Sequence, residues 1–132
     1  MELSKMKKLT IIFLFIAAAV AGCQEKKGQN IDLDVVEFEQ RILEENAFVL
    51  DVRTPDEVSD GIIEGATVLN ILGDEFLERY GELPKDKTIY VYCRSGNRSR
   101  KAVAFLKNKG YDSIYHLQGG MKAWLQANKK IK

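Results

Sequence analysis

The amino-acid sequence predicts an α/β fold with a mainly parallel central sheet that is covered by helices on both faces. From Ile31 onward, short apolar segments with strand-like composition alternate with segments of helical character. The run TIYVY at 88–92 is the strongest strand signal, because it is apolar apart from its first threonine. Short strands that alternate with helices are typical of a parallel sheet between two helical layers.

The first half of the chain contains two capping-box patterns. Asp34 is followed three residues later by Glu37, which predicts the start of a helix. Thr54 is followed in the same way by Glu57, with a proline at the first helical position. The expected order is a helix from 34, a strand at 47–52, a helix from 54 and a strand at 66–71.

The second half continues the alternation. Gly81 is expected to end a short helix, and Gly110 a longer one with an apolar face. The last helix is expected to place its lysine-rich end at the negative end of the helix dipole. The expected order is a helix at 74–81, a strand at 88–92, a helix at 99–110, a strand at 113–117 and a helix at 121–130.

Length and charge limit the classes of function. The chain has 132 residues, of which 45% are hydrophobic and 30% charged, as expected for one globular domain. Residues 1–23 hold three of the 20 basic and one of the 19 acidic residues, which leaves 17 basic and 18 acidic residues in the remainder. A body so close to neutral gives no reason to expect a nucleic acid partner.

The amino terminus has the pattern of a processing signal. Three lysines precede the apolar run at 9–22. As a helix this run would span only about 21 Å, which is short of the roughly 30 Å hydrocarbon layer of a membrane. The pattern therefore favours a secretory signal peptide over a permanent transmembrane helix.

The end of this run adds a second feature. The sequence VAGC, which ends at Cys23, resembles the lipobox of bacterial lipoproteins, in which cleavage before the cysteine leaves that residue carrying lipid. We expect a signal peptide at 1–22, a lipidated Cys23 and a polar tether through residue 30. The protein would then be exported and anchored to a membrane through lipid, on its periplasmic or cell-surface side.

If Cys23 carries lipid, Cys93 is the only free thiol of the mature chain. It directly follows the strongest strand, and ligands of parallel sheets bind at the carboxyl ends of strands. Gly96 permits a positive φ angle and Asn97 tolerates one, so the loop can curl around the sulfur before a helix that begins near Ser99. Backbone N–H groups at a helix start and nearby arginines stabilise a thiolate. A cysteine that merely fills a core needs none of these neighbours.

The loop sequence CRSGNRS resembles the active-site loop of rhodanese-type sulfurtransferases, C-x-x-G-x-R-S/T. The segments 49–57, 61–71 and 114–124 resemble further blocks of this family in the same order. The resemblance covers 31–132 and implies a single-domain rhodanese-like fold with three layers. It also implies that Cys93 takes sulfane sulfur from a donor such as thiosulfate, becomes a persulfide, and passes the sulfur to cyanide or a thiol. No cofactor and no metal are part of this expectation.

The resemblance also assigns roles to single residues. Cys93 would be the nucleophile, and the backbone N–H groups of the loop would stabilise its anion. Arg98 would bind an anionic donor or brace the loop, whereas Arg94 would contact anions such as thiosulfate. Asp51 and Arg53 match a D-x-R pair, which is expected to brace the fold. The predicted loop consists of Arg94, Ser95, Gly96, Asn97, Arg98 and Ser99.

Two further positions are informative. Ile62 stands where the family usually has histidine, and we expect altered packing there rather than lost chemistry. His116, the one histidine of the chain, is interpreted as a structural residue of the last strand. No general base is required if the loop itself forms the thiolate.

Two other functions compete with sulfur transfer. Phosphatases and arsenate reductases of related fold use C-x5-R, whereas Cys93 and Arg98 form C-x4-R, and this shorter loop favours sulfur transfer. The second alternative is a persulfide carrier or thiol-redox module that acts with a partner protein, which would then be the sulfur acceptor. Turnover with small donors and acceptors separates this module from an enzyme.

Overall fold

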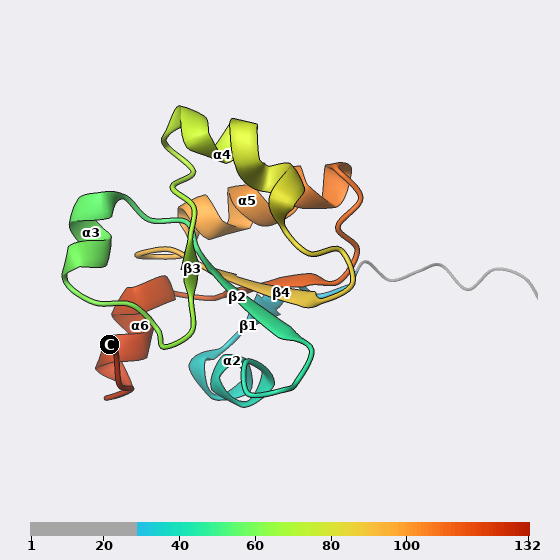
Figure 1. The fold of residues 1–132 in the computed structure, drawn as a ribbon. Helices are drawn as coiled ribbons and strands as arrows, with labels where there is room; N and C mark the ends of the chain where they lie inside the picture. Colours follow the sequence, from blue (N-terminus) through green and yellow to red (C-terminus); the bar gives the residue numbers. More distant parts are fainter. Residues whose placement is uncertain (1–28) are drawn as a thin grey trace, which may run out of the picture.

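The computed structural model describes residues 29–132, so the predicted signal peptide and Cys23 lie outside the described residues. Five parallel strands form one sheet in the order β1-β5-β4-β2-β3 (Figure 1). The strands are β1 (Asp32–Leu33), β2 (Ala47–Asp51), β3 (Thr67–Val68), β4 (Thr88–Tyr92) and β5 (Ile114–Leu117). The helices are α2 (Val35–Arg41), α3 (Pro55–Ser59), α4 (Asp74–Arg79), the 3-10 turn η1 (Tyr80–Glu82), α5 (Asn97–Asn108) and α6 (Gly120–Gln126).

The sheet separates two hydrophobic cores. Ile89, Val91 and Cys93 from the β4 region belong to the core under α4 and α5, which we call the α4–α5 core. Tyr90 and Tyr92 face the opposite side and belong to the core under α2 and α6. These two helical layers lie on opposite faces of the sheet in Figure 1. The predicted α/β class with a parallel sheet between helices is therefore confirmed.

Strand β1 was not predicted from the sequence. It has only two residues, which is too short for any periodic pattern to be recognised. It pairs in parallel with β5, and the register sets Asp32 opposite His116. The pairing brings together a carboxylate and a histidine that are 84 positions apart in the chain.

The start of α5 differs from the prediction. The helix begins at Asn97 rather than near Ser99. Gly96 is its N-cap residue and has a φ angle of 102°, which turns the chain directly into the helix. Asn97 is helical, so Gly96 is the loop residue that has a positive φ angle.

The end of α6 differs as well, because the helix stops at Gln126 rather than at 130. Asn128 has a φ angle of 54°, which the helix cannot continue through. The indole N–H of Trp124 donates to the carbonyl of Lys130 at 2.9 Å and holds the tail against the helix. The predicted helix end is therefore wrong: Lys129 and Lys130 follow the helix, and Lys129 pairs with Glu39 on α2.

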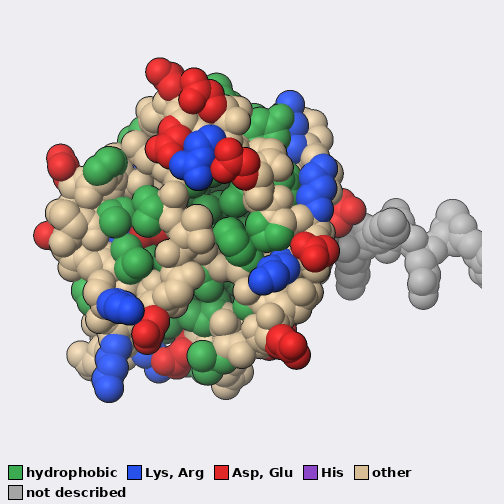
Figure 2. Space-filling model, viewed as in Figure 1, with side chains coloured by type: hydrophobic (Ala, Val, Ile, Leu, Met, Phe, Trp, Pro, Cys, Tyr) green, Lys and Arg blue, Asp and Glu red, His purple; other side chains and the backbone are tan. Residues whose placement is uncertain are grey.

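The surface mixes charge types. On the face seen in Figure 2, acidic and basic side chains are interspersed, with hydrophobic side chains between them. This face consequently presents no field of a single sign. In the part that the structure describes, no helix has both the length and the apolar character needed to cross a membrane.

Candidate active site

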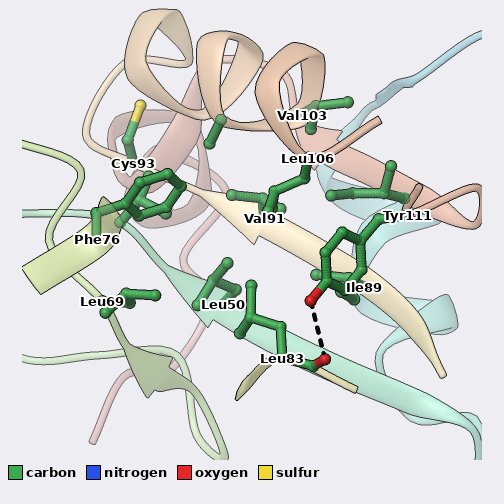
Figure 3. Close-up of a cluster of buried hydrophobic side chains, with 13 residues drawn as sticks. Leu50, Leu69, Phe76, Leu83, Ile89, Val91, Cys93, Val103, Leu106 and Tyr111 are labelled. Carbon is green, nitrogen blue, oxygen red and sulfur yellow. Dashed lines mark hydrogen bonds between the residues drawn. The ribbon is translucent and has the colours of Figure 1, made fainter. Parts of the chain in front are cut away.

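Cys93 lies directly after β4, at the carboxyl edge of the sheet, where parallel sheets bind ligands. Its side chain is fully buried, and it is the free cysteine of the described residues. It belongs to the α4–α5 core together with Phe76 and Val91 (Figure 3). Three residues then form a tight loop before α5 begins. The cysteine thus lies between the apolar side chains of the core and the polar backbone of the loop.

The sulfur of Cys93 has one hydrogen-bond partner in the loop and another in the first turn of α5. The N–H of Gly96 donates to Sγ at 3.1 Å, and the Oγ of Ser99 lies 3.5 Å from Sγ. Burial alone raises the pKa of Cys93, but hydrogen bonds from Ser99 and from the backbone of Ser95 and Gly96 outweigh it and lower the pKa below its ordinary value. The arrangement therefore favours the thiolate, which is the nucleophilic form.

The amino terminus of α6 holds the other side of the loop. The N–H of Met121 donates to the carbonyl of Cys93 at 2.8 Å, and that of Lys122 donates to the carbonyl of Arg94 at 3.0 Å. Both bonds require α6 to approach the loop backbone closely at Gly120. With these carbonyls held by α6, the loop N–H groups are left to face the sulfur.

Arg98 joins the loop to α3 through Glu57. Its two terminal nitrogens lie 2.8 and 2.6 Å from the two carboxylate oxygens of Glu57, a bidentate pair. Glu57 also accepts from the N–H of Thr54 at 3.0 Å, within the capping box that the sequence predicts for α3. The guanidinium of Arg98 is thus engaged with protein, a geometry that braces the loop.

This pair predicts a pH-dependent contribution to stability. The hydrogen bonds from Arg98, followed by those from Thr54, lower the pKa of Glu57 from its usual 4.5 to about 2 against the effect of burial. A lowered pKa stabilises the fold fully above the unfolded value, and this stability disappears as the pH falls through 4.5 toward about 2. Glu57→Gln is expected to lower the free energy of unfolding by about 3 kcal/mol near neutral pH.

Urea denaturation of the wild type and Glu57→Gln at several pH values tests this expectation. The difference between them should stay constant from neutral pH until the pH approaches 4.5, and should then shrink as the pH falls toward about 2. Glu75→Gln is the matched control, because Glu75 pairs with Arg79 on an exposed helix surface and should change stability by less than about 1 kcal/mol. Equal effects of both substitutions at neutral pH would contradict the assignment.

Asp51 and Arg53 form a second, deeply buried ion pair at the end of β2. Arg53 Nη2 lies 2.7 Å from Asp51 Oδ2, and both side chains are nearly inaccessible to water. Arg53 also donates to the carbonyl of Gly61 at 2.7 Å and to that of Glu57 at 3.1 Å. These bonds tie the end of β2 to the middle of α3 and to the loop that follows it. The pair supports the fold beneath the loop.

An open cavity of about 340 Å³ lies beside the loop. Its lining includes two exposed cationic residues, Arg94 and Lys122, and two acidic residues, Glu57 and Asp60. Arg53 also lines the cavity but is paired with Asp51, so Arg94 and Lys122 are the cations that the cavity offers to an anion. Cys93 is not among the residues that line the cavity, and its side chain is buried.

Sequence reasoning named the loop but missed several residues that complete the site. Lys122 and Gly120 come from α6, and Glu57 was recognised as a helix cap without its partner Arg98. The doublet Gly119–Gly120 before a helix was the available signal, because both residues have positive φ angles. Among residues 29–132, no three acidic, histidine or cysteine side chains are grouped so as to hold a metal ion.

Comparisons with known proteins agree with this geometry. Residues 34–127 match the family model described as "Rhodanese-like domain". A protein named sulfurtransferase from Allochromatium vinosum is 37% identical over 94 residues, which cover 70% of this chain and 86% of that protein. A tRNA uridine(34) hydroxylase from Prochlorococcus marinus is 29% identical, over 92% of this chain and 42% of that protein.

A solved structure is similar to this chain as well. The rhodanese-related protein from Thermoplasma volcanium superposes with a TM-score of 0.69 at 31% identity, over 76% of this chain and 96% of that one. The match extends along almost the whole of that protein, so it concerns a complete domain rather than an isolated motif. The chain belongs to the rhodanese-like domain family.

Proposed function

We propose that the protein is a sulfurtransferase that carries sulfane sulfur as a persulfide on Cys93. The observation that carries this proposal is the set of hydrogen bonds that converge on Sγ and lower the pKa of the thiol despite its burial. A persulfide anion has the same need for N–H donors as a thiolate. Sulfurtransferases among the relatives support the reaction class.

With thiosulfate as donor, the reaction has two displacement steps. The Cys93 thiolate attacks the outer sulfur of thiosulfate, a new S–S bond forms, and the S–S bond of the donor breaks. Sulfite departs with the electron pair of that bond. The carbon of cyanide then attacks the outer sulfur of the persulfide, so that thiocyanate leaves and the thiolate returns. Neither step needs a metal, an oxidant or a reductant.

The cavity supports an anionic donor. Arg94 and Lys122 offer positive charge beside the loop, and neither cation is engaged in an ion pair within the described residues. Thiosulfate is small enough for a cavity of about 340 Å³. The acceptor is proposed as cyanide or a small thiol, because the cavity is open to solvent.

Intact-mass spectrometry of the full-length chain tests the proposal. Incubation with thiosulfate is expected to add the mass of one sulfur atom, and cyanide is expected to remove it and release thiocyanate over many cycles. A stable adduct without turnover would instead favour a persulfide carrier that requires a protein acceptor. If neither thiosulfate nor polysulfide gives an adduct, the persulfide mechanism is wrong.

A further inference from the structure

Behind the loop, a chain of hydrogen bonds leads from the sulfur of Cys93 to the protein surface. Sγ lies 3.5 Å from the Oγ of Ser99, which lies 3.0 Å from Nδ1 of His116. The other ring nitrogen, Nε2, lies 2.6 Å from Oδ1 of Asp32. Arg100 reaches the same oxygen at 2.9 Å. The chain therefore joins residues of β1, β5 and α5 to the end of β4.

This chain of hydrogen bonds runs from the protein interior to the solvent. Ser99 and His116 are at most 1% exposed, whereas the side chain of Asp32 is 28% exposed. None of these three residues lines the cavity beside Arg94, so the chain reaches solvent by a separate route. The ring of His116 also packs against the loop, because a Cβ atom on Gly96 would lie 3.8 Å from Cε1.

The partners fix the positions of the protons. Burial raises the pKa of Asp32, but hydrogen bonds from His116 and Arg100 outweigh it and lower the pKa, so Asp32 is a carboxylate. It accepts the Nε2 proton of His116, which leaves a lone pair on Nδ1. The Ser99 hydroxyl then donates to Nδ1, with the carbonyl of Gly96 at 3.1 Å as its other acceptor, while its oxygen accepts from the thiol of Cys93.

We infer that His116 receives the proton of Cys93 through Ser99 when the thiolate forms. The S–H proton passes to the Oγ of Ser99 while the hydroxyl proton passes to Nδ1 of His116, and the electron pair stays on sulfur. The products are a thiolate that accepts from the hydroxyl, and an imidazolium held by Asp32. Because His116 does not touch the sulfur, it is a positioning residue. This inference rests on the proposed function of Cys93.

The surroundings of His116 suit this role. Burial lowers its pKa, Asp32 opposes that effect and Arg100 adds to it, so the ring is neutral near neutral pH and Nδ1 keeps the lone pair that accepts from Ser99. On β4 its partner is Val91, which carries no charge. On α2, Glu37 and Arg41 pair with each other at 2.6 Å. Asp32 and Arg100 are therefore the charges that act directly on the ring.

The test measures how fast iodoacetamide alkylates Cys93 as a function of pH, in the full-length chain carrying Cys23→Ser so that one thiol remains. His116→Asn is expected to slow alkylation about tenfold at and below neutral pH and to match the parent at alkaline pH, an upward shift of about one unit. A structural role would leave the profile unshifted or lower the rate equally at every pH, and either result would overturn the inference.

Three further variants make the test specific. Asp32→Asn removes the carboxylate that holds the Nε2 proton, lies near the surface, and is expected to shift the profile in the same direction. Asp112→Asn, at an exposed carboxylate, is the matched control and should not shift it. Ser99→Ala combined with His116→Asn should shift the profile no further than Ser99→Ala alone, because the histidine acts through the hydroxyl.

These measurements are independent of the sulfurtransferase proposal. Alkylation needs neither a sulfur donor nor an acceptor, so it reports the ionisation of Cys93 even in a protein that fails to turn over. If His116→Asn does not fold, Asp32→Asn decides the question alone. An unshifted profile of folded Asp32→Asn would then overturn the inference.

Discussion

Replacement of Cys93 with serine is expected to abolish sulfur transfer while leaving the fold intact. Serine has nearly the same shape, and its hydroxyl keeps the Gly96 N–H and the Ser99 side chain as hydrogen-bond partners. Its oxygen, however, does not ionise near neutral pH and cannot hold a sulfane sulfur. We expect the rate of thiocyanate formation to fall roughly 10⁴-fold or more. The free energy of unfolding should change by only about 1 kcal/mol.

The measurement follows thiocyanate release and intact mass for the wild type, Cys93→Ser and Cys23→Ser. The last variant is the control, because it removes the other cysteine of the chain and should keep wild-type turnover in solution. A sulfur adduct that persists in Cys93→Ser but disappears in Cys23→Ser would move the sulfur carrier outside the loop. That outcome would contradict the assignment of Cys93 as the sulfur carrier.

The loop itself could be predicted from the sequence because its chemistry is local. Cys93, Gly96 and Arg98 are separated by a few positions, and the strand before them and the helix after them have clear patterns. A glycine with a φ angle of 102° at a helix start is a local requirement as well. The predicted start of the helix near Ser99 was wrong, because Asn97 is compatible with either the loop or the helix.

The supports of the loop could not be predicted, because they depend on pairings that are distant in the chain. Glu57 meets Arg98 across 41 positions, and Asp32 meets His116 across 84. The second pairing requires β1, which is too short to leave a pattern. From the sequence alone His116 is interpreted as structural, because its contact with Asp32 depends on the register of β1 and β5.

Gly120→Ala is expected to damage the site more than any other substitution that leaves the reacting atoms in place. A Cβ atom at Gly120 would lie 2.5 Å from the carbonyl oxygen of Cys93 and 2.6 Å from the carbonyl carbon of Arg94. These are backbone atoms, so either α6 or the loop must shift. The hydrogen bonds from Met121 and Lys122 to the two carbonyls would then lengthen or break. At about 1 kcal/mol for each bond, with the clash added, we expect a loss of roughly 3 kcal/mol in the free energy of unfolding.

A displacement of the loop is also expected to move the hydrogen-bond donors that surround the sulfur of Cys93. The N–H of Gly96 lies 3.1 Å from Sγ in a loop whose Cys93 and Arg94 carbonyls are held by α6. A misplacement of about 1 Å costs on the order of 10²-fold in rate. We therefore expect Gly120→Ala to lower thiocyanate formation about a hundredfold at a temperature where the variant is still folded. Steady-state kinetics and urea denaturation of the same preparation check both effects.

Gly65→Ala is the control that distinguishes the effect of the steric contact from the effect of the backbone conformation. Gly65 has a φ angle of 82°, which is at least as unfavourable for alanine as the 58° of Gly120, but a Cβ atom there would meet nothing within 4 Å. Its cost is therefore conformational, roughly 1 kcal/mol, and turnover should be unchanged. If Gly120→Ala behaves like Gly65→Ala, close packing of α6 on the loop is not what orients the N–H groups toward the sulfur. The hydrogen bonds of Gly96 and Ser99 would then have to arise within the loop alone, and Arg98 with its partner Glu57 would be the brace to test next.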